Sequence, residues 1–455
     1  MSRTFKTVDY EATLESTVRL RDCVPEDHLA RFVADLVAHL DLSAFYARYG
    51  ARGGVPYAPQ VLLGLLFYSY ATGVFSSRKI ERATYDQVPF RFLAGNTHPD
   101  HDTLAHFRTT FLDLLPDLFT QLLLLAQAAG VLRLGSISLD GTKIHADASK
   151  SQAVSYAHLL ELEKRLHAEV DDLLARAAQA DTSPLPDSLV LADEVADRQA
   201  RLSRLAAAKA VLEARAAERY AAEQAAYEAT VREREHQARR SGRQPRGRPP
   251  QPPTAGPRDD DQYNFTDPDS RIMKNSGDGG FDQHYNAQVA VDQASRFIVG
   301  QSLSNHPVDV REALPTVDSI PPAVGGPAAA ALDTGYWSEA NMVGLAERSI
   351  QPYIALGREG HRRDWRAYFE QEEPPPVAAG ASRREQMAYR LRTAIGRAIY
   401  RLRKSTVEPV IGIIKETLGF RQFSLRGLGK VAGEWCLVCL AYDVKCFHGL
   451  RPSRG

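Results

Sequence analysis

The first part of the chain has apolar residues at helical spacing. In residues 56–73 and 103–130, apolar side chains recur at every third or fourth position, which places them on one face of a helix. Turn-forming residues in 95–100 break this pattern before the helical segment that begins at His101. These features predict an all-helical N-terminal domain over residues 1–130.

The pattern then changes to short apolar runs that are typical of strands. Residues 131–149 contain extended stretches, and residues 285–292 alternate between apolar and polar side chains before a turn at 293–296. The run 297–303 fits the returning strand of a hairpin. Three further elements complete the prediction: a strand over residues 328–332, a helix over 338–348 and a strand over 351–356.

Between the first strand region and the hairpin, the composition becomes helical. Residues 151–240 are dominated by Ala, Glu, Arg, Leu and Gln, which favour long helices, and prolines interrupt the stretch near 183–186. We expect an antiparallel helical hairpin inserted into the domain. Residues 241–257, rich in Arg, Gly and Pro, predict a flexible basic linker. Residues 131–150 and 258–450 would then form one domain.

The order of these elements favours an α/β (α+β) fold. Strand, hairpin, strand, helix and strand, followed by a further helix, correspond to an RNase-H-like mixed sheet with flanking helices. In this prediction an all-helical N-terminal domain precedes the sheet and a helical insertion interrupts it. A chain of 455 residues has room for about two to four domains, and 44% hydrophobic residues can supply their cores.

The composition also predicts a cytoplasmic protein. Four cysteines are too few for a disulfide scaffold, and the N-terminus lacks the apolar core of a signal peptide. No apolar run approaches the roughly 18–20 residues of a membrane span. Cys436, Cys439, Cys446 and His448 include metal-ligating residue types, but their apolar surroundings favour small hydrophobic side chains over a zinc site.

Charge is distributed unevenly although the net charge is +0. Residues 383–430 contain twelve Arg or Lys residues and three Glu residues. Offsets of three, four and seven place Arg401, Lys404, Glu408 and Lys415 on one helical face. We therefore expect Arg401, Lys404 and Lys415 to contact phosphate, and a solvated helix face is the alternative.

Other basic residues extend this prediction. Arg403 and Arg426 lie in the same basic stretch and are included in the expected DNA-binding set. A second basic cluster, at residues 232–248, runs into a proline-rich segment, whereas acidic residues concentrate at 171–197 and 259–261. The zero net charge is therefore a cancellation between regions, and it leaves room for a nucleic-acid partner.

Three acidic residues carry the strongest functional signal. Asp140 and Asp333 each follow a short apolar run and precede small turn-forming residues, as expected at the C-terminal tip of a buried strand. Glu408 lies in the basic helical stretch. Either aspartate alone could be a turn residue or a helix cap. Together the three favour a site for two hard cations, because Mg²⁺ prefers oxygen ligands and leaves room for phosphate.

Several motifs in a fixed order add a family resemblance. They are Leu139-Asp-Gly-Thr-Lys-Ile, Thr266-Asp-Pro-Asp-Ser-Arg-Ile-Met, Tyr285-Asn-Ala-Gln-Val-Ala-Val-Asp, Ala331-Leu-Asp-Thr-Gly-Tyr, Thr406-Val-Glu-Pro-Val-Ile-Gly and Phe423-Ser-Leu-Arg-Gly-Leu-Gly-Lys-Val. Over about residues 55–450 the chain resembles bacterial insertion-sequence DDE transposases. The nearest type is the eleven-eighty-two group, with the helical N-terminal domain common among group-five relatives.

The resemblance implies a function, a cofactor and a partner. It implies an RNase-H-like catalytic core with two Mg²⁺ ions, for which Mn²⁺ can substitute. Asp140, Asp333 and Glu408 match the first, second and third acids of the family. The implied partner is double-stranded DNA, as terminal inverted repeats and as target, bound by a homodimer in the bacterial nucleoid. The N-terminal domain would bind DNA ends or dimerise.

One motif departs from the family pattern. Related families often show Tyr, two residues, Arg, three residues, Glu, six residues and Lys. The spacing from Glu408 to Lys415 fits, but Tyr400 and Arg403 are one residue too far from Glu408. This leaves open which residues have the Tyr and Arg roles.

Two-metal chemistry would let one site hydrolyse the transposon end and then join the freed 3′-hydroxyl to target DNA. It requires Asp140 and Asp333 on adjacent strands, with Glu408 on a nearby helix. His284, His306, Asp309 and Asp292 are further polar residues expected near the core, in structural or supporting roles. Two alternatives stay open: a transposase-derived DNA-binding protein without catalysis, and a structure-specific metal-dependent nuclease.

Overall fold

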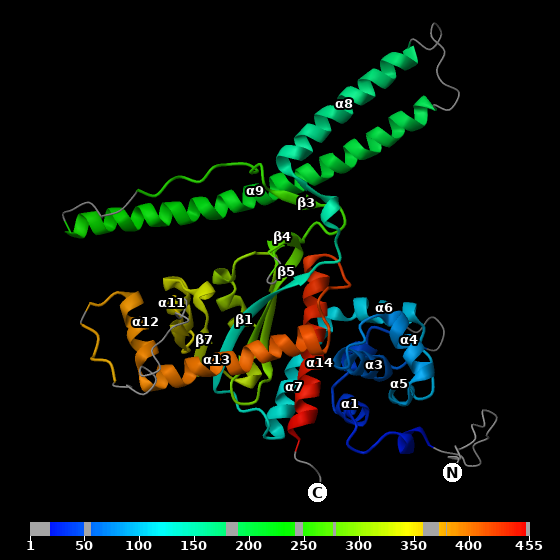
Figure 1. Ribbon diagram of the computed structural model, residues 1–455, viewed down its shortest axis with the longest axis vertical. Coiled ribbons are helices and arrows are strands. Elements are labelled where there is room, and N and C mark those ends of the chain that lie inside the picture. The colour runs from blue at the N-terminus through cyan, green and yellow to red at the C-terminus, as the bar shows by residue number, and fades with distance from the viewer. Residues whose placement is uncertain are drawn as a thin grey trace, which may run out of the picture. The chain divides into compact units, whose positions relative to one another are not determined.

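The computed structural model describes residues 19–49, 56–178, 190–241, 249–275, 279–357, 373–378 and 380–451. The chain forms two compact units (Figure 1). Unit 1 contains Met1–Ile144 and Asn286–Gly455, and unit 2 contains His145–Tyr285. Strands β1 (Ser136–His145) and β5 (Phe281–Asp292) carry the chain from one unit into the other.

Unit 1 begins with a helical region whose central helix is almost entirely apolar. This helix, α3, buries eleven of its thirteen residues and starts with a proline in its first turn, where no intrahelical N–H bond is lost. The elements of the region are η1 (Leu20–Cys23), α1 (Leu29–Ala38), α2 (Ser43–Tyr46), α3 (Pro59–Ala71), α4 (Ser77–Asp86), α5 (Val88–Leu93), α6 (His101–Thr110), η2 (Leu112–Leu114) and α7 (Leu115–Ala128).

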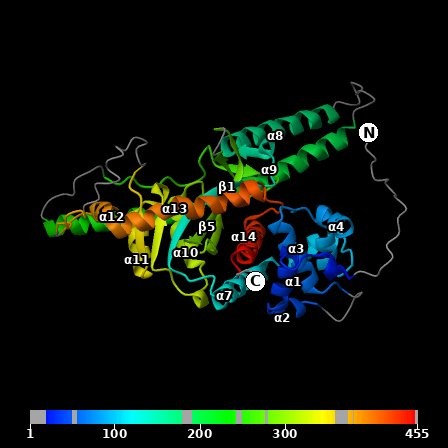
Figure 2. The same cartoon turned by 60° about the horizontal axis from the view of Figure 1, so that its bottom comes forward.

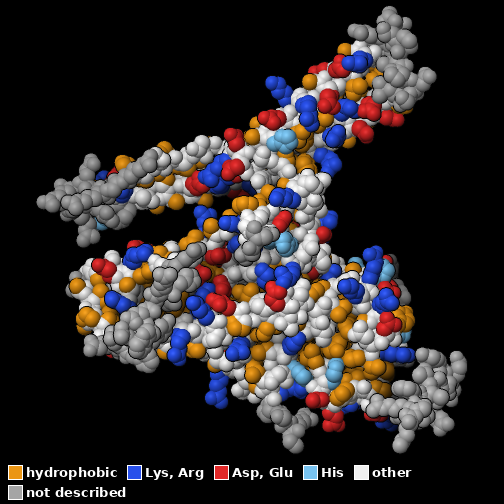
Figure 3. All heavy atoms as spheres, viewed as in Figure 1, with side chains coloured by type: hydrophobic (Ala, Val, Ile, Leu, Met, Phe, Trp, Pro, Cys, Tyr) orange, Lys and Arg blue, Asp and Glu red, His pale blue; other side chains and the backbone are white. Residues whose placement is uncertain are grey.

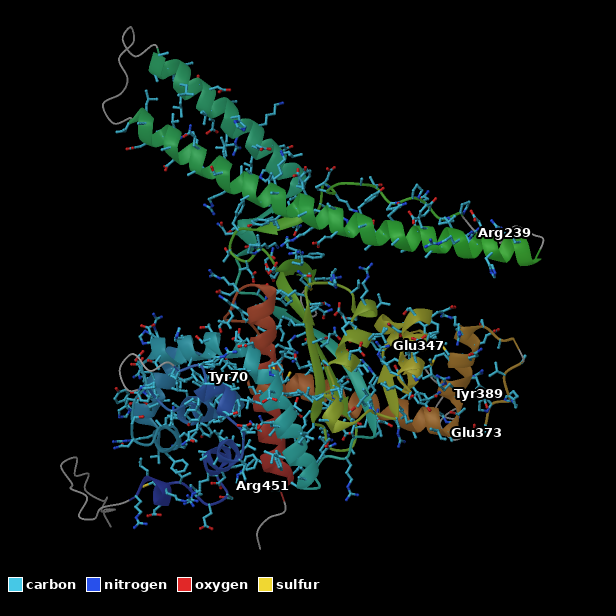
Figure 4. All side chains as sticks on the ribbon, turned by 180° about the vertical axis from the view of Figure 1, so that it is seen from behind. Tyr70, Arg239, Glu347, Glu373, Tyr389 and Arg451 are labelled. Carbon is cyan, nitrogen blue, oxygen red and sulfur yellow. The ribbon has the colours of Figure 1, made fainter. Side chains whose placement is uncertain are left out.

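The last helix, α14 (Leu428–Leu450), packs against α1, α3 and α7 as well as against strand β6. Its Glu434 is fully buried and accepts a hydrogen bond from the Tyr70 hydroxyl at 3.3 Å. Arg108 donates to the same hydroxyl at 2.8 Å and lies 4.0 Å from Glu434. Tyr70 lies among the N-terminal helices beside α14 (Figure 4). These contacts join the N-terminal helices and α14, segments more than 300 residues apart, into one core.

The sheet of unit 1 is mixed, in agreement with the predicted α+β class. Strands β5, β1, β7 and β8 follow one another across it, and β6 pairs with β5. β5 and β6 are antiparallel, which confirms the predicted hairpin, whereas β7 is parallel to both β1 and β8. The strands not yet bounded are β6 (Ile298–Ser304), β7 (Ala329–Leu332) and β8 (Gln351–Ile354).

One expectation about β1 is wrong. Asp140 was expected at the C-terminal tip of a strand, but β1 runs through it to His145, and residues 131–135 belong to no strand. The parallel ladder with β7 is what ends near Asp140, because its last pair is Ser138 with Ala331. β1 continues past Asp140 because its second half has other neighbours. Asp140 has no pairing residue on β7 because β7 is short, and not because β1 itself ends there.

Helices and short turns surround the sheet, and α13 lies across one face of it (Figures 1 and 2). Serine caps the N-termini of α11 and α12, and Thr393 caps α13. The elements are η4 (Asp309–Arg311), α10 (Ala313–Asp318), η5 (Pro322–Val324), η6 (Thr334–Tyr336), α11 (Glu339–Glu347), α12 (Arg383–Arg392), α13 (Ala394–Gly412) and the π-helical turn η8 (Ile413–Thr417).

Unit 2 has a small apolar core between two long helices, α8 (Tyr156–Ala178) and α9 (Leu191–Ser241). Leu159 and Leu166 of α8 pack with Leu205 and Leu212 of α9. The shorter elements of this unit are η3 (Lys150–Gln152), β2 (Ala153–Ser155), β3 (Gln262–Asn264) and β4 (Arg271–Lys274). Strand β2 pairs with β3, and β4 pairs with the first residues of β5.

The two helices of unit 2 occupy the segment expected to form a helical hairpin. The predicted interruption at residues 183–186 lies outside the described residues, as do residues 242–248 of the predicted linker. Residues 249–257 have no regular secondary structure.

Across the described residues, no single helix is long and apolar enough to cross a membrane. One bent pair, His101–Thr110 with Leu112–Ala128, meets the length and composition of a span. Ten side chains of these two segments are buried in the core of unit 1: Leu104, Phe107, Arg108, Leu112, Leu115, Leu118, Phe119, Leu122, Leu123 and Ala126.

Candidate active site

The strand register brings the two aspartates together. β1 and β7 pair in parallel, with Ser138 opposite Ala331. Asp140 and Asp333 are each two residues further along, so both project just beyond the last pair of this ladder. Both side chains are partly exposed, Asp140 at 18% and Asp333 at 38%. The structure therefore places the two acids next to each other, Asp140 on β1 and Asp333 directly after β7, as the sequence predicted.

Arg403 of α13 connects these aspartates to Glu408. Its Nη2 atom lies 2.9 Å from Asp140 Oδ2 and 3.6 Å from Asp333 Oδ2, and its Nη1 atom lies 3.4 Å from Glu408 Oε1. Because both aspartate oxygens contact one nitrogen, their separation cannot exceed the sum of those two distances, well below the roughly 10 Å at which shared metal binding would become implausible. One guanidinium thus gathers three carboxylates from three separate elements.

Hydrogen bonds from buried side chains fix α13 against β1. Thr406 Oγ1 donates to Ser138 Oγ at 2.9 Å, and Gln293 Nε2 donates both to Ser138 Oγ and to the carbonyl of Ile399. Arg403 is itself on the buried face of the helix, with an 8% exposed side chain. Packing around the Arg403 side chain therefore fixes the position of its guanidinium beside Asp140.

The helix that carries Glu408 is irregular just after it. Pro409 lies inside α13 and has no N–H to donate to the preceding turn. The chain then continues as the π-helical turn of residues 413–417. Such turns are rare and occur often at functional sites. Within this turn, Lys415 Nζ donates to Thr142 Oγ1 at 3.1 Å and to the carbonyl of Lys143 at 3.3 Å.

Burial raises the pKa of Asp140 to about 6. The positive charge of Arg403 opposes this shift, whereas Asp333 and Glu408 add to it because like charges disfavour ionisation. A carboxyl with this pKa is still mostly ionised at pH 7. One buried cation and three acids therefore act in opposite directions on the pKa of Asp140, and such perturbed carboxyl groups are common at functional sites.

A polar network lies directly behind the three acids. The Tyr336 hydroxyl donates to Gln288 Oε1, and Gln288 Nε2 donates to Asn286 Oδ1 and to Asp309 Oδ1, each at 3.0 Å. Burial raises the pKa of Tyr336 well above its usual value, so its hydroxyl remains a donor. The network contains one polar residue that was singled out from the sequence, Asp309, and three that were not singled out individually, Asn286, Gln288 and Tyr336.

Gly141 has a steric role in this network. A Cβ atom at this position would lie 2.1 Å from Gln288 Nε2, closer than any real contact. The residue after Asp140 must therefore lack a side chain so that Gln288 can approach β1. Lys143, two residues further on, lies 3.4 Å from Asp309 Oδ1, and burial lowers the pKa of its amine.

The expected DNA-binding residues occupy different environments. Arg401 and Lys404 lie on the exposed face of α13, and Arg426 is exposed before α14. Arg403, in contrast, is buried and contacts the acids. Lys415 is half-buried against β1. One sequence signal could have separated Arg403 from its neighbours, because it occupies the same helical stripe as the buried residues Thr406, Val407 and Val410.

The remaining polar candidates have structural contacts. Asp292 accepts hydrogen bonds from the backbone and hydroxyl of Ser295 in the β5–β6 turn. His306 lies 3.1 Å from Glu312 Oε1. The His284 ring lies beside that of His145 in unit 2, with ring centroids 4.3 Å apart and the ring planes tilted by 33°.

The cysteines fit the hydrophobic interpretation. Cys436 and Cys439 are fully buried in α14, and burial raises the pKa of the Cys436 thiol to about 12, which disfavours the thiolate that zinc requires.

The carboxylates have the chemistry of a magnesium site, since all three offer hard oxygen ligands. In the part of the chain that the structure describes, however, no three His, Cys, Asp or Glu side chains are close enough together to enclose a metal ion. The guanidinium of Arg403 lies among the acids instead and supplies a positive charge. The three carboxylates fit a hard cation, and the Arg403 guanidinium balances part of their negative charge.

Comparison with protein families gives two matches. Residues 18–110, which include α1 to α6, match the family described as Transposase domain (DUF772), and residues 378–448, which include Arg403 and Glu408, match the Transposase DDE domain. Comparisons with curated proteins and with solved structures give no match. DDE transposases generally use divalent metals and act on DNA. The two matches, one at each end of unit 1, support an insertion-sequence transposase with DNA as its partner.

Proposed function

We propose that this protein is a DDE transposase of the eleven-eighty-two type. Its catalytic acids for cleaving and joining DNA would be Asp140, Asp333 and Glu408. The observation that carries the proposal is the convergence of these three acids, from β1, the end of β7 and α13, on Arg403. A buried arginine that contacts several acids is weak evidence for a stabilising role, because burying its charge costs free energy.

The three carboxylates would hold two Mg²⁺ ions, with Mn²⁺ as a substitute. When bound, these ions would activate water or a 3′-hydroxyl and stabilise the leaving oxygen in phosphodiester cleavage. Asp140 is the most buried of the three and lies next to Asp333, so these two carboxylates would hold the ions together with Glu408. Arg403 holds the carboxylates in place and is also correctly charged to contact a substrate phosphate.

The N-terminal helices support binding to DNA ends. α4 is fixed to α6 by the Glu81 carboxylate, which accepts from His101 Nδ1 at 2.8 Å, and by His98, which stacks on Tyr85 at 3.8 Å. The exposed part of α4 presents the side chains of Arg78, Lys79 and Arg82. Blue side chains gather over the α4 and α6 region in Figure 3. We propose that this basic face contacts the terminal inverted repeats.

The decisive experiment is cleavage of DNA that carries the ends flanking the gene of this protein. With Mg²⁺, the wild type is expected to cut at those ends. Asp140→Asn, Asp333→Asn and Glu408→Gln should each reduce cleavage by about 1,000-fold or more, because each removes a charged ligand worth several kcal/mol in the transition state. Gel-shift affinity should change little, and each variant should remain folded.

Asp318→Asn is the matched control. Asp318 pairs with Arg348 on the surface of unit 1 and contacts none of the three acids. It should cleave like the wild type. End binding without cleavage by the wild type would favour the DNA-binding alternative, and cleavage without joining to target DNA would favour the nuclease.

A further inference from the structure

Unit 2 contains a hollow of about 180 Å³ between α8, α9 and the segment that follows β3. Its inner wall is apolar and consists of Leu162 and Leu166 of α8, Leu205 of α9 and the ring of Phe265. Leu166 and Leu205 belong to the core of the unit, and the backbone N–H of Phe265 donates to the carbonyl of Gln152 at 3.0 Å. The hollow is therefore a fixed part of the fold. We name it the Arg–Phe pocket.

Besides Gln152, three arginines and no acid complete the lining of the Arg–Phe pocket. They are Arg165 of α8 and Arg201 and Arg204 of α9. The Arg204 guanidinium lies 5.2 Å from the centroid of the Phe265 ring. Arg165 has one exposed ion pair, with Glu169 at 3.7 Å, which contributes little. Arg201 has no hydrogen-bond or ion-pair partner among the described residues.

This lining differs from the rest of the hairpin. Elsewhere on α8 and α9, several basic side chains pair with nearby acids, as Arg198 does with Glu169 and Glu194, and Lys209 with Glu163. Three cations around an apolar hollow repel one another, and an anion would relieve that repulsion. The pocket therefore has the charge complementarity of an anionic ligand.

The chemistry of the wall restricts which anion fits. An aromatic ring with an arginine over it and three leucines is suited to a flat, weakly polar group, and the arginine rim is suited to phosphate, which guanidinium groups bind in a bidentate manner. The volume exceeds that of a few water molecules but is smaller than a typical pocket of about 300–1,000 Å³ for a drug-sized ligand. A single nucleobase with its phosphate has both properties.

We propose that the Arg–Phe pocket binds one unpaired nucleotide of the DNA substrate, with its base against Phe265 and its phosphate at Arg201. An intact duplex keeps its bases stacked inside and could offer only phosphate, whereas an extruded or single-stranded nucleotide offers both groups. The inference rests on the proposed function in one respect, since it takes DNA as the partner. It assigns unit 2 the recognition of distorted or opened DNA.

The test uses the full-length protein and two duplexes of the same sequence. One carries a single unpaired 2-aminopurine, and the other has the same 2-aminopurine paired. Wild-type protein should bind the unpaired duplex more tightly and increase its fluorescence, because the base leaves the stack. Phe265→Leu should weaken this binding by about 5- to 100-fold, the range measured for loss of one stacking contact.

Arg201→Ala tests the phosphate contact without touching the core. It should weaken binding of the unpaired duplex and lower the salt slope of log K by about 0.7 to 0.9. Arg176→Ala is the matched control, because Arg176 is an exposed arginine of α8 that pairs with Asp172 and does not line the pocket. It should behave like the wild type.

Equal affinity of the wild type for the two duplexes, or unchanged binding in both Phe265→Leu and Arg201→Ala, would overturn the proposal. Cleavage of transposon ends distinguishes this failure from failure of the proposed function. If the wild type cleaves ends but does not discriminate unpaired DNA, only the pocket assignment is wrong. If it neither cleaves ends nor binds any DNA, both are wrong.

Discussion

Charged residues are used in opposite ways in the acidic site of unit 1 and on the helices of unit 2. In unit 1, one arginine with an 8% exposed side chain contacts three acids from three elements. On α8 and α9, ion pairs join neighbouring turns or facing helices, and every partner is at least 24% exposed in the pairs of Arg198 and Lys209. Figure 3 shows acidic and basic side chains intermingled along this hairpin.

The comparison shows where charge is costly and where it is not. Exposed pairs on a helix are screened by water and contribute roughly 0–1 kcal/mol each. A buried arginine with several carboxylates loses hydration that the attraction barely restores, so such a cluster is weak evidence for stability and better evidence for a retained function. The hairpin can vary its charges, whereas the site of unit 1 cannot vary one charge without affecting the others.

The largest effect on stability is expected from removing Arg403. In Arg403→Ala, three carboxylates lose the cation that contacts all of them, and the free energy of unfolding in the absence of divalent metal should fall by about 3 kcal/mol. Urea unfolding measures this loss. Millimolar Mg²⁺ should recover part of it, because the cation would replace the missing charge.

Arg198→Ala is the control for Arg403→Ala, since it removes a hairpin arginine that also has two acidic partners. It should cost less than about 1 kcal/mol and should not respond to Mg²⁺. Equal losses in the two variants would show that the two regions do not differ in the way argued above.

A pH effect of intermediate size is expected from Asp140. Its pKa is about 6 in the folded protein and 3.8 in the reference state, so between about pH 4 and 6 the folded state binds more protons than the unfolded state. The contribution of this residue to stability therefore falls as pH rises through that window, by about 2–3 kcal/mol, and is constant above it.

Asp140→Asn isolates the pH effect. The difference in unfolding free energy between wild type and variant, measured from pH 4 to 8, should shift by that amount and then level off above about pH 7. A difference that does not change with pH would mean that Asp140 is not buried in solution.

A smaller effect is expected on α13. Arg401→Ala and Lys404→Ala remove exposed charges beside the acidic site, and each should weaken binding similarly for all DNA sequences, with a salt slope lower by about one unit. Stability should not change. Arg176→Ala, at an exposed arginine of α8 that pairs with Asp172, serves as the comparison. An unchanged slope would favour a merely solvated face on α13.

The smallest effect is expected from the facing pair of the hairpin. Lys209→Ala removes the 2.9 Å ion pair with Glu163, in which both side chains are partly exposed. The loss of stability should be about 0.5 kcal/mol and should diminish in 1 M salt. A loss above about 2 kcal/mol would place this pair in the same class as the acidic site.

The sequence alone determined the local elements and the three acids. Periodicity located the hairpin now seen as β5 and β6, and composition located the two long helices, because both signals arise from neighbouring residues. The contexts of Asp140, Asp333 and Glu408 singled them out from many other acids. The same signals overstated one boundary, since an apolar run that stops at Asp140 does not end β1, whose pairing continues with other neighbours.

Tertiary structure decided everything that depends on contacts between distant residues. The spacing from Arg403 to Glu408 left the role of Arg403 open, and the packing of α13 on β1 through Thr406 and Ser138 settled which groups its guanidinium touches. The close approach of Gln288 to Gly141 and the burial of Glu434 beside Tyr70 and Arg108 likewise leave no local pattern. Periodicity records which face of an element is apolar, but the partner of that face is chosen by packing across hundreds of residues.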